Sequence, residues 1–147
     1  MNMLLQKPKP RYWTAASLAR LSVLLDLPLD QYSQDWPWEV ADPERIDELL
    51  GLYQSGGLDE DERFTLMDMI IQCFEDLGDS LENDSRWQAT LAMIESHIDL
   101  HAHSVWYWAC FDAIDIEDAF WTSPCFREMV ERNMVPREAL LDDAPTG

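Results

Sequence analysis

The sequence is short of the residues on which most catalytic motifs depend. It contains only five Gly, three His and three Cys, and they form no P-loop, GxGxxG, GxSxG or CxxC pattern. Nucleotide-binding loops and the common nucleophilic sites are therefore excluded. We expect a protein without enzyme activity, without a cofactor and without a metal.

Positive charge is also scarce, because ten Lys or Arg stand against 29 Asp or Glu and give a net charge of −19. An excess of this size repels phosphate, which argues against direct binding of nucleic acid, and it attracts basic surfaces. The excess is uneven: residues 42–118 contain twenty acids and three Arg, a net of −17, whereas residues 1–25 contain four basic residues and no acid. The basic start is either a solvated arm or a counter-charge for the acidic segment.

Long apolar runs are missing too. No run approaches the roughly 18 apolar residues of a membrane-spanning helix, and the N-terminus lacks the pattern of a secretory signal peptide. The cysteines Cys73, Cys110 and Cys125 are odd in number and lie far apart in apolar or aromatic surroundings, which is typical of buried reduced thiols. We therefore expect a cytoplasmic protein that does not enter a membrane.

Apolar residues are abundant, at 47%, and their strongest pattern covers residues 59–78. Asp59 and Glu62 form a capping box, and the apolar residues that follow fill about 200° of a helical wheel, twice the ~100° stripe of a surface helix. We expect this helix to be central and buried, with one narrow strip facing water. The strip consists of Asp61, Thr65, Asp68, Gln72, Glu75, Asp76 and Asp79.

The remaining chain predicts an all-α protein. Residues 105–111, VWYWACF, fit either a buried strand or a helix, and helix is chosen because every neighbour is helical. Caps and periodicity predict further helices at 14–25, 43–54, 87–101, 115–121 and 124–132, with a last turn at Pro136. Leu18, Leu21, Val23, Leu24 and Leu25 should face inward from the first helix, and Trp36 and Trp38 should cover the edge of the core from a loop. The predicted organisation is a flexible basic arm (1–11), one bundle of about six helices (12–141) and a frayed acidic tail (142–147).

The three histidines all fall within HIDLHAH, residues 97–103. The run IDLHAHS resembles the Asp-x-His-x-His motif of metal-dependent amidohydrolases and PHP phosphoesterases, which would imply a metal cluster inside a barrel-like α/β fold. The additional histidines of those sites are absent, and a barrel typically needs about 250 residues. A weaker alternative places a metal between His97 and His101, one helical turn apart. Because His101 lies on an apolar stripe, we expect a core histidine instead.

Carboxylates and aromatic rings occur together near the C-terminal end. Residues 112–121 read DAIDIEDAFW and follow the aromatic run 106–108. Such a combination suits a basic protein partner, because rings exclude water while acids accelerate encounter and provide specificity. With the strip of the central helix, the predicted contacts are Asp61, Asp68, Glu75, Asp79, Asp112, Asp115, Glu117, Asp118 and Trp121.

In size, in charge and in the segments LDEDERFTLMDMIIQCFEDL and VWYWACFDAIDIEDAFW, the chain resembles the small acidic cytoplasmic immunity proteins that bacteria keep against polymorphic or contact-dependent toxins. The resemblance implies a stoichiometric inhibitor that occupies the active site or substrate channel of a basic toxin domain, often a nuclease. The resemblance does not identify any residue of this chain as functional. The alternatives are a nucleic-acid mimic that blocks a DNA-binding protein, and an adaptor or homodimer subunit whose acids only keep it soluble.

Overall fold

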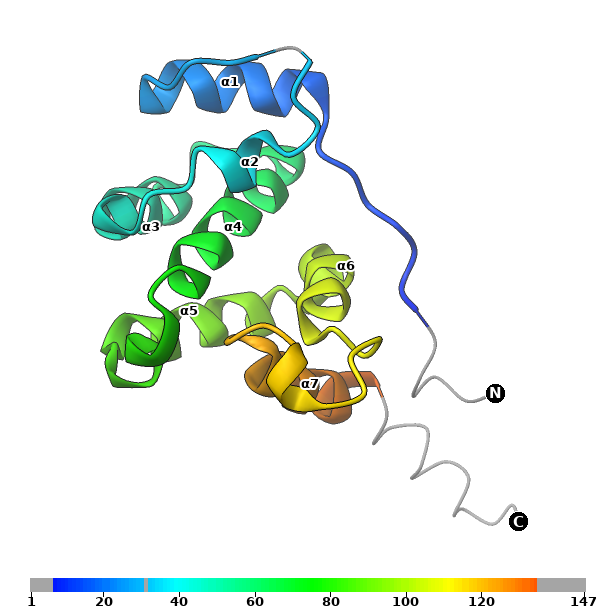
Figure 1. The fold of residues 1–147 in the computed structure, drawn as a ribbon. Coiled ribbons are helices and arrows are strands. Elements are labelled where there is room, and N and C mark those ends of the chain that lie inside the picture. The colour runs from blue at the N-terminus through cyan, green and yellow to red at the C-terminus, as the bar shows by residue number, and fades with distance from the viewer. Residues whose placement is uncertain (1–6, 31, 135–147) are drawn as a thin grey trace. The chain divides into compact units, whose positions relative to one another are not determined.

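All regular structure in the described part of the chain is helical (Figure 1). The computed structural model describes residues 7–30 and 32–134, with seven α-helices and three short 3-10 helices. The prediction of an all-α fold is confirmed. Most of the predicted arm, the turn at Pro136 and the acidic tail lie outside the described residues. The described residues form two compact units, one within residues 11–81 and one made of residues 7–10 with 82–134, and each is described by itself.

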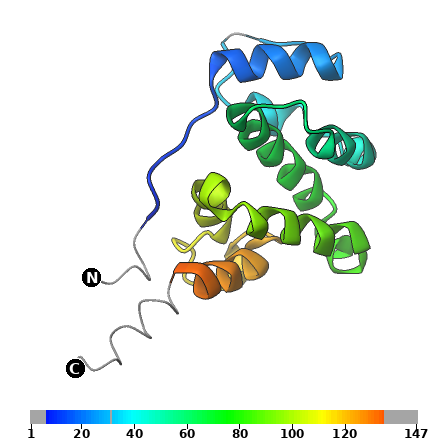
Figure 2. The ribbon, with the colours of Figure 1, turned by 180° about the vertical axis from the view of Figure 1, so that it is seen from behind.

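The unit of residues 11–81 is organised around α4 (Glu60–Glu75). Three earlier helices contact α4: α1 (Ala15–Leu25), α2 (Trp36–Glu39) and α3 (Ile46–Gln54), which follows the 3-10 helix η1 (Pro43–Arg45). Figure 2 shows the ribbon from behind, with α1 and α3 again beside α4. The prediction of a central helix is confirmed.

The sequence of α4 explains both its start and its burial. The Asp59 carboxylate accepts a hydrogen bond from the backbone N–H of Glu62 at 2.8 Å, and the Glu62 side chain accepts one from the Asp59 N–H at 3.0 Å. This is the predicted capping box. Every residue from Phe64 to Ile71 is buried, so α4 is enclosed on more sides than its wheel predicts.

Helix α1 begins at the predicted cap, where Thr14 accepts a hydrogen bond from the Ser17 N–H at 3.0 Å. Its buried residues are Ser17, Leu21 and Leu25, spaced by four, because α1 packs on α4 along a single stripe. The prediction that Val23 and Leu24 face inward is wrong. Val23 is 78% exposed, and both side chains lie on the side of α1 that faces solvent.

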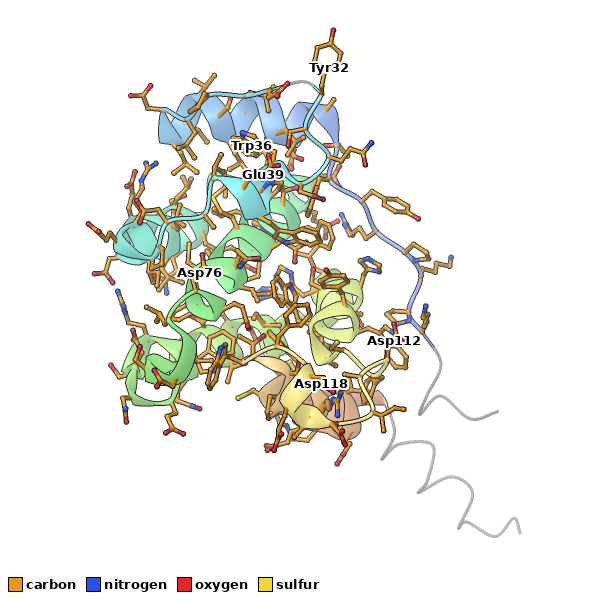
Figure 3. The ribbon with its side chains drawn as sticks, in the orientation of Figure 1. Tyr32, Trp36, Glu39, Asp76, Asp112 and Asp118 are labelled. Carbon is orange, nitrogen blue, oxygen red and sulfur yellow. The ribbon has the colours of Figure 1, made fainter. Side chains whose placement is uncertain are left out.

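The tryptophans of the 35–40 segment cover the core, as predicted, but from the short helix α2 and not from a loop. Trp36 is buried and its indole N–H donates to the carbonyl of Pro28 at 2.7 Å. Trp38 meets Trp13 edge to face, with ring centroids 5.0 Å apart. Tyr32, in the loop before α2, is exposed and points away from Trp36 (Figure 3).

The second unit contains α5 (Ser85–Ser96), α6 (Ile98–Ala109), the 3-10 helix η3 (Ile116–Asp118) and α7 (Ser123–Met134), and η2 (Gly78–Asn83) joins α4 to α5. α6 contacts both α5 and α7. Trp87 and Phe126, both buried, meet edge to face at 5.7 Å between centroids. The core of this unit is therefore aromatic.

Two predictions about this unit need correction. The apolar stripe from residue 87 to residue 101 predicts one helix. The structure has two, because His97 has a φ of −125° and a ψ of 46°, which are not helical, and separates α5 from α6. The spacing of apolar residues does not reveal this interruption, because a single non-helical residue need not change the spacing. The choice of helix for residues 105–111 is confirmed as far as Ala109, after which Cys110 adopts a left-handed conformation (φ 53°) and ends α6.

Candidate partner-binding surface

The polar strip of α4 faces water only in part, because its middle is covered, and this corrects the first half of the predicted site. Thr65 is fully buried and Asp68 is only 5% exposed. The reason is that α1 and the residues that precede it lie against the strip. The sequence predicts the strip's position on the wheel but not the segment that covers it.

Three polar contacts join this segment to α4. The Arg11 guanidinium pairs with the Asp61 carboxylate at 2.9 Å, and the indole N–H of Trp13 donates to the Asp68 carboxylate at 2.9 Å. Between these two, the hydroxyl groups of Ser17 and Thr65 share a hydrogen bond of 2.9 Å. We call these six residues the polar seam. It stabilises the unit, and neither carboxylate is available as the unpaired partner contact that the sequence analysis predicts.

The seam also shows which of the two predictions about the basic start of the chain holds for Arg11. Besides pairing with Asp61, the Arg11 guanidinium lies 5.4 Å from the centre of the Phe64 ring, a cation–π arrangement. Arg11 therefore neutralises part of the acidic helix within its own chain.

The two remaining acids predicted near α4 lie past its polar seam. Glu75 is the last residue of α4 and is half-buried, and Asp79 is exposed in η2. Because α4 ends between them, they do not lie on one helix. Among the four acids predicted for this unit, only Asp79 is fully exposed.

The second half of the predicted site is exposed throughout. We call residues 111–121, between α6 and α7, the acidic loop. Its carboxylates, Asp112, Asp115, Glu117 and Asp118, are all exposed and form no ion pair with any residue that the structure describes. Figure 3 shows Asp112 and Asp118 on this segment. The structure brings these four acids and Trp121 together in one short stretch.

Large apolar side chains alternate with the acids of the loop. Ile114 is 97% exposed, Ile116 is 43% exposed and Trp121 is 56% exposed. Trp121 belongs to the predicted contacts but the two isoleucines do not: Ile116 falls within the helix expected over residues 115–121, and Ile114 lies just before it. Only the 3-10 turn Ile116–Asp118 forms, so that expectation is wrong. The signal was present in the alternation of apolar and acidic residues over 114–117, IDIE, which has no helical period.

Arg127 of α7 fixes the start of the acidic loop through hydrogen bonds to backbone carbonyls. Its Nε donates to the carbonyl of Ala109 at 2.7 Å, and its Nη2 donates to the carbonyls of Cys110 at 2.6 Å and Ala113 at 3.3 Å. The guanidinium also lies 5.4 Å from the centre of the Phe111 ring. Arg127 thus satisfies carbonyls at the end of α6, where a cation is favourable, and its side chain makes no ion pair with the loop's acids.

The far end of the loop rests on an aromatic layer. Phe120 packs on Trp108 with centroids 4.8 Å apart and on Tyr107 at 5.9 Å. The buried Ser123 hydroxyl donates to the carbonyl of Trp108 at 2.6 Å and accepts from the N–H of Phe120 at 3.0 Å. Both ends of the acidic loop are therefore fixed to α6 and α7, which define its shape.

The histidines do not form a metal site in the described part of the chain, where no group of three potential ligand residues has the required arrangement. His97 is exposed at the break between α5 and α6, while His101 is fully buried as the sequence predicts. His103 is half-buried. Burial, and to a smaller extent the charge of Lys7, lowers the pKa of its imidazole.

The cysteines are all free thiols. Cys73 is fully buried on α4, and burial raises the pKa of its thiol to about 12. Cys110 and Cys125 are only half-buried, so the prediction of three buried thiols is correct for one of them. A thiol with so high a pKa does not act as a nucleophile at neutral pH.

No helix among residues 7–30 and 32–134 combines the length and apolar character needed to cross a membrane. Comparison of the chain with protein-family models, with curated proteins and with solved structures found no match in any of the three.

Proposed function

We propose that this chain is a non-enzymatic, acidic binding protein that neutralises a basic protein, and that the acidic loop is its contact surface. In the specific form suggested by the resemblance to immunity proteins, the partner is a toxin domain, often a nuclease, and the inhibitor acts in the bacterial cytoplasm. A single observation carries the proposal. Four exposed carboxylates without ion-pair partners among the described residues stand on a loop that is fixed at both ends.

The distribution of charge favours a partner-binding surface over a surface whose acids only keep the protein soluble. Some exposed or half-exposed acids elsewhere in the described chain have basic partners, such as Glu48 with Arg45 and Glu95 with Arg132, whereas the loop places four acids without an ion pair to any described residue within residues 112–118. Arg127, which contacts the backbone of the acidic loop, is engaged with carbonyl groups instead. Uncompensated acids in one place cost stability through mutual repulsion and give a long-range attraction for a cationic partner.

The alternatives have less support. A nucleic-acid mimic needs carboxylates repeated along an extended face, whereas this loop is short and its acids alternate with isoleucine and tryptophan. An adaptor or homodimer that uses the same loop would bring eight like charges together, since each copy contributes four acids, and this arrangement is strongly unfavourable.

The proposal is tested by the salt dependence of binding to a basic candidate, the C-terminal domain of a secreted protein encoded beside this chain. We expect the association rate to fall at least about tenfold when ionic strength rises from about 0.01 M to about 1 M, as screening shortens from roughly 30 Å to roughly 3 Å. The double reversal Asp115→Lys with Asp118→Lys should lower the rate at low salt by a similar factor.

The matched control reverses Glu82 and Glu131, two exposed acids outside the loop, and changes the net charge by the same amount. It should lower the rate by much less. If both double variants slow association equally, total charge and not the loop drives binding. A rate that does not depend on salt would contradict the proposal.

A further inference from the structure

The apolar side chains of the acidic loop carry a second inference, which rests on the proposed function and names the chemistry of the partner. Ten large apolar side chains are exposed in the described chain, and five of them fall within residues 107–121: Tyr107, Phe111, Ile114, Ile116 and Trp121. Single exposed apolar residues are common on protein surfaces, but a concentration of this kind marks an interaction surface.

Ile114 stands out within this group. At 97% exposure it has almost no contact with its own protein, although an isoleucine favours burial strongly. Acids flank it closely, with Asp112 two residues before it and Asp115 directly after it. An exposed aliphatic tip with carboxylates around it has the composition of a binding hot spot: an apolar anchor at the centre and a polar rim that excludes water.

The loop is also ordered before any partner arrives. Arg127 donates hydrogen bonds to three carbonyls, of Ala109, Cys110 and Ala113, and the last of these belongs to the residue directly before Ile114. A hydrogen bond of 3.1 Å from the Ala113 N–H to the Cys110 carbonyl closes the turn. Binding therefore need not order the loop, and less of the interaction free energy is lost to entropy.

We infer that Ile114 is the anchor of the acidic loop, and that the partner is a protein whose surface has an apolar hollow rimmed by Lys or Arg. Charge complementarity selects a cationic rim for the four carboxylates. The projecting isoleucine requires an apolar hollow, which a phosphate-binding cleft lacks because it is lined by polar donors. The pairing of these two features distinguishes a protein surface from a simple polycation.

Two probes separate the apolar contribution from the charge. The first is an amphipathic peptide of Leu and Lys, with an apolar face flanked by ammonium groups. The second is a Lys and Ser peptide of equal length and charge. Backbone amide signals of the full chain are followed by NMR during titration with each peptide at about 0.01 M ionic strength, where electrostatic attraction is least screened.

We expect the Leu/Lys peptide to bind about tenfold or more tightly than the Lys/Ser peptide, as burial of one aliphatic side chain implies, and to shift the amides of residues 111–121. Ile114→Ser should remove this advantage and leave binding of the Lys/Ser peptide unchanged. The matched control is Val23→Ser on α1, which removes an aliphatic side chain of similar exposure outside the loop and should change neither affinity.

Equal affinities of the two peptides for the unmodified protein would overturn the inference, and so would an Ile114→Ser variant that keeps the difference. Shifts centred on Val23 instead of the loop would also overturn it. A different result would contradict the proposed function itself: neither peptide binds at low ionic strength. Because Ile114 makes almost no contact with the fold, a loss of binding by its variant does not reflect unfolding.

Discussion

The polar seam provides the sharpest test of the fold, through the substitution Trp13→Phe. The indole N–H of Trp13 donates to the carboxylate of Asp68, which is only 5% exposed, while the Trp13 ring packs against Trp38. Phenylalanine keeps most of the ring contact and removes the donor. The variant therefore isolates one hydrogen bond to a buried charged group.

The expected cost follows from the charge of the acceptor. A hydrogen bond to a charged group contributes about 1.5–3 kcal/mol to stability, and a buried carboxylate that loses a donor also keeps its desolvation penalty. We expect the free energy of unfolding to fall by about 2 kcal/mol. With a urea dependence of about 2 kcal/mol per M, the unfolding midpoint should move down by about 1 M.

The assay is urea unfolding followed by far-ultraviolet circular dichroism, because tryptophan fluorescence changes with the substitution itself. The control is Trp106→Phe, which makes the same chemical change at a half-buried indole whose N–H bonds to no described residue, and which should cost less. In the Asp68→Asn background, Trp13→Phe should cost about 1 kcal/mol less than in the unmodified chain. Equal costs in both backgrounds would refute the contact between Trp13 and Asp68.

Three further predictions concern stability and reactivity. Hydrogen bonds from Arg132 lower the pKa of Glu95, so the pair stabilises the fold above the ordinary carboxyl pKa of about 4.3. The loss of stability caused by Arg132→Gln should be below about 1 kcal/mol at neutral pH, because both side chains are partly exposed. In thermal melts this loss should shrink as the pH falls below the ordinary pKa and vanish once the pH is below the lowered pKa of Glu95 in the folded protein. In a thiol-labelling assay at about pH 8, Cys73 should react only after denaturation, because burial raises the pKa of its thiol to about 12 and makes its sulfur inaccessible. The other two cysteines should react in the native protein. Rapid labelling of all three thiols in the native protein would disprove this prediction. Ile70→Ala should lower the free energy of unfolding by about 2–5 kcal/mol, whereas Ile114→Ala should change it by less than about 0.5 kcal/mol. Similar urea midpoints for the two variants would contradict the burial of Ile70 and the exposure of Ile114.

Local signals in the sequence were sufficient for much of the fold. The caps at Thr14 and Asp59 and the broad apolar arc of α4 depend on neighbours along the chain, and the structure places all of them as predicted. The break at His97 was missed because nothing nearby marks it: no Gly or Pro interrupts the chain there.

The candidate site was predictable only in part, because exposure depends on distant segments. A carboxylate on the wheel of α4 faces water or Trp13 according to how residues 11–17 return to the helix, and no local pattern reveals that path. In the acidic loop the composition alone was enough to place four acids on the surface. The exposure of Ile116 was missed because a helix was expected over residues 115–121, where only a 3-10 turn forms.

The order of α1, α2, α3 and α4 along the chain has a consequence for how the protein is made. The helix that offers packing surface to the other three is synthesised after all of them. At about 5–20 residues per second, the ribosome needs roughly 3–10 s to extend the chain over the ~50 residues between the end of α1 and the end of α4. Throughout this time the nascent α1 has no native surface to cover its leucines. The unit must therefore assemble in one late event, and premature termination before α4 would release a fragment suited to proteolysis and not to folding.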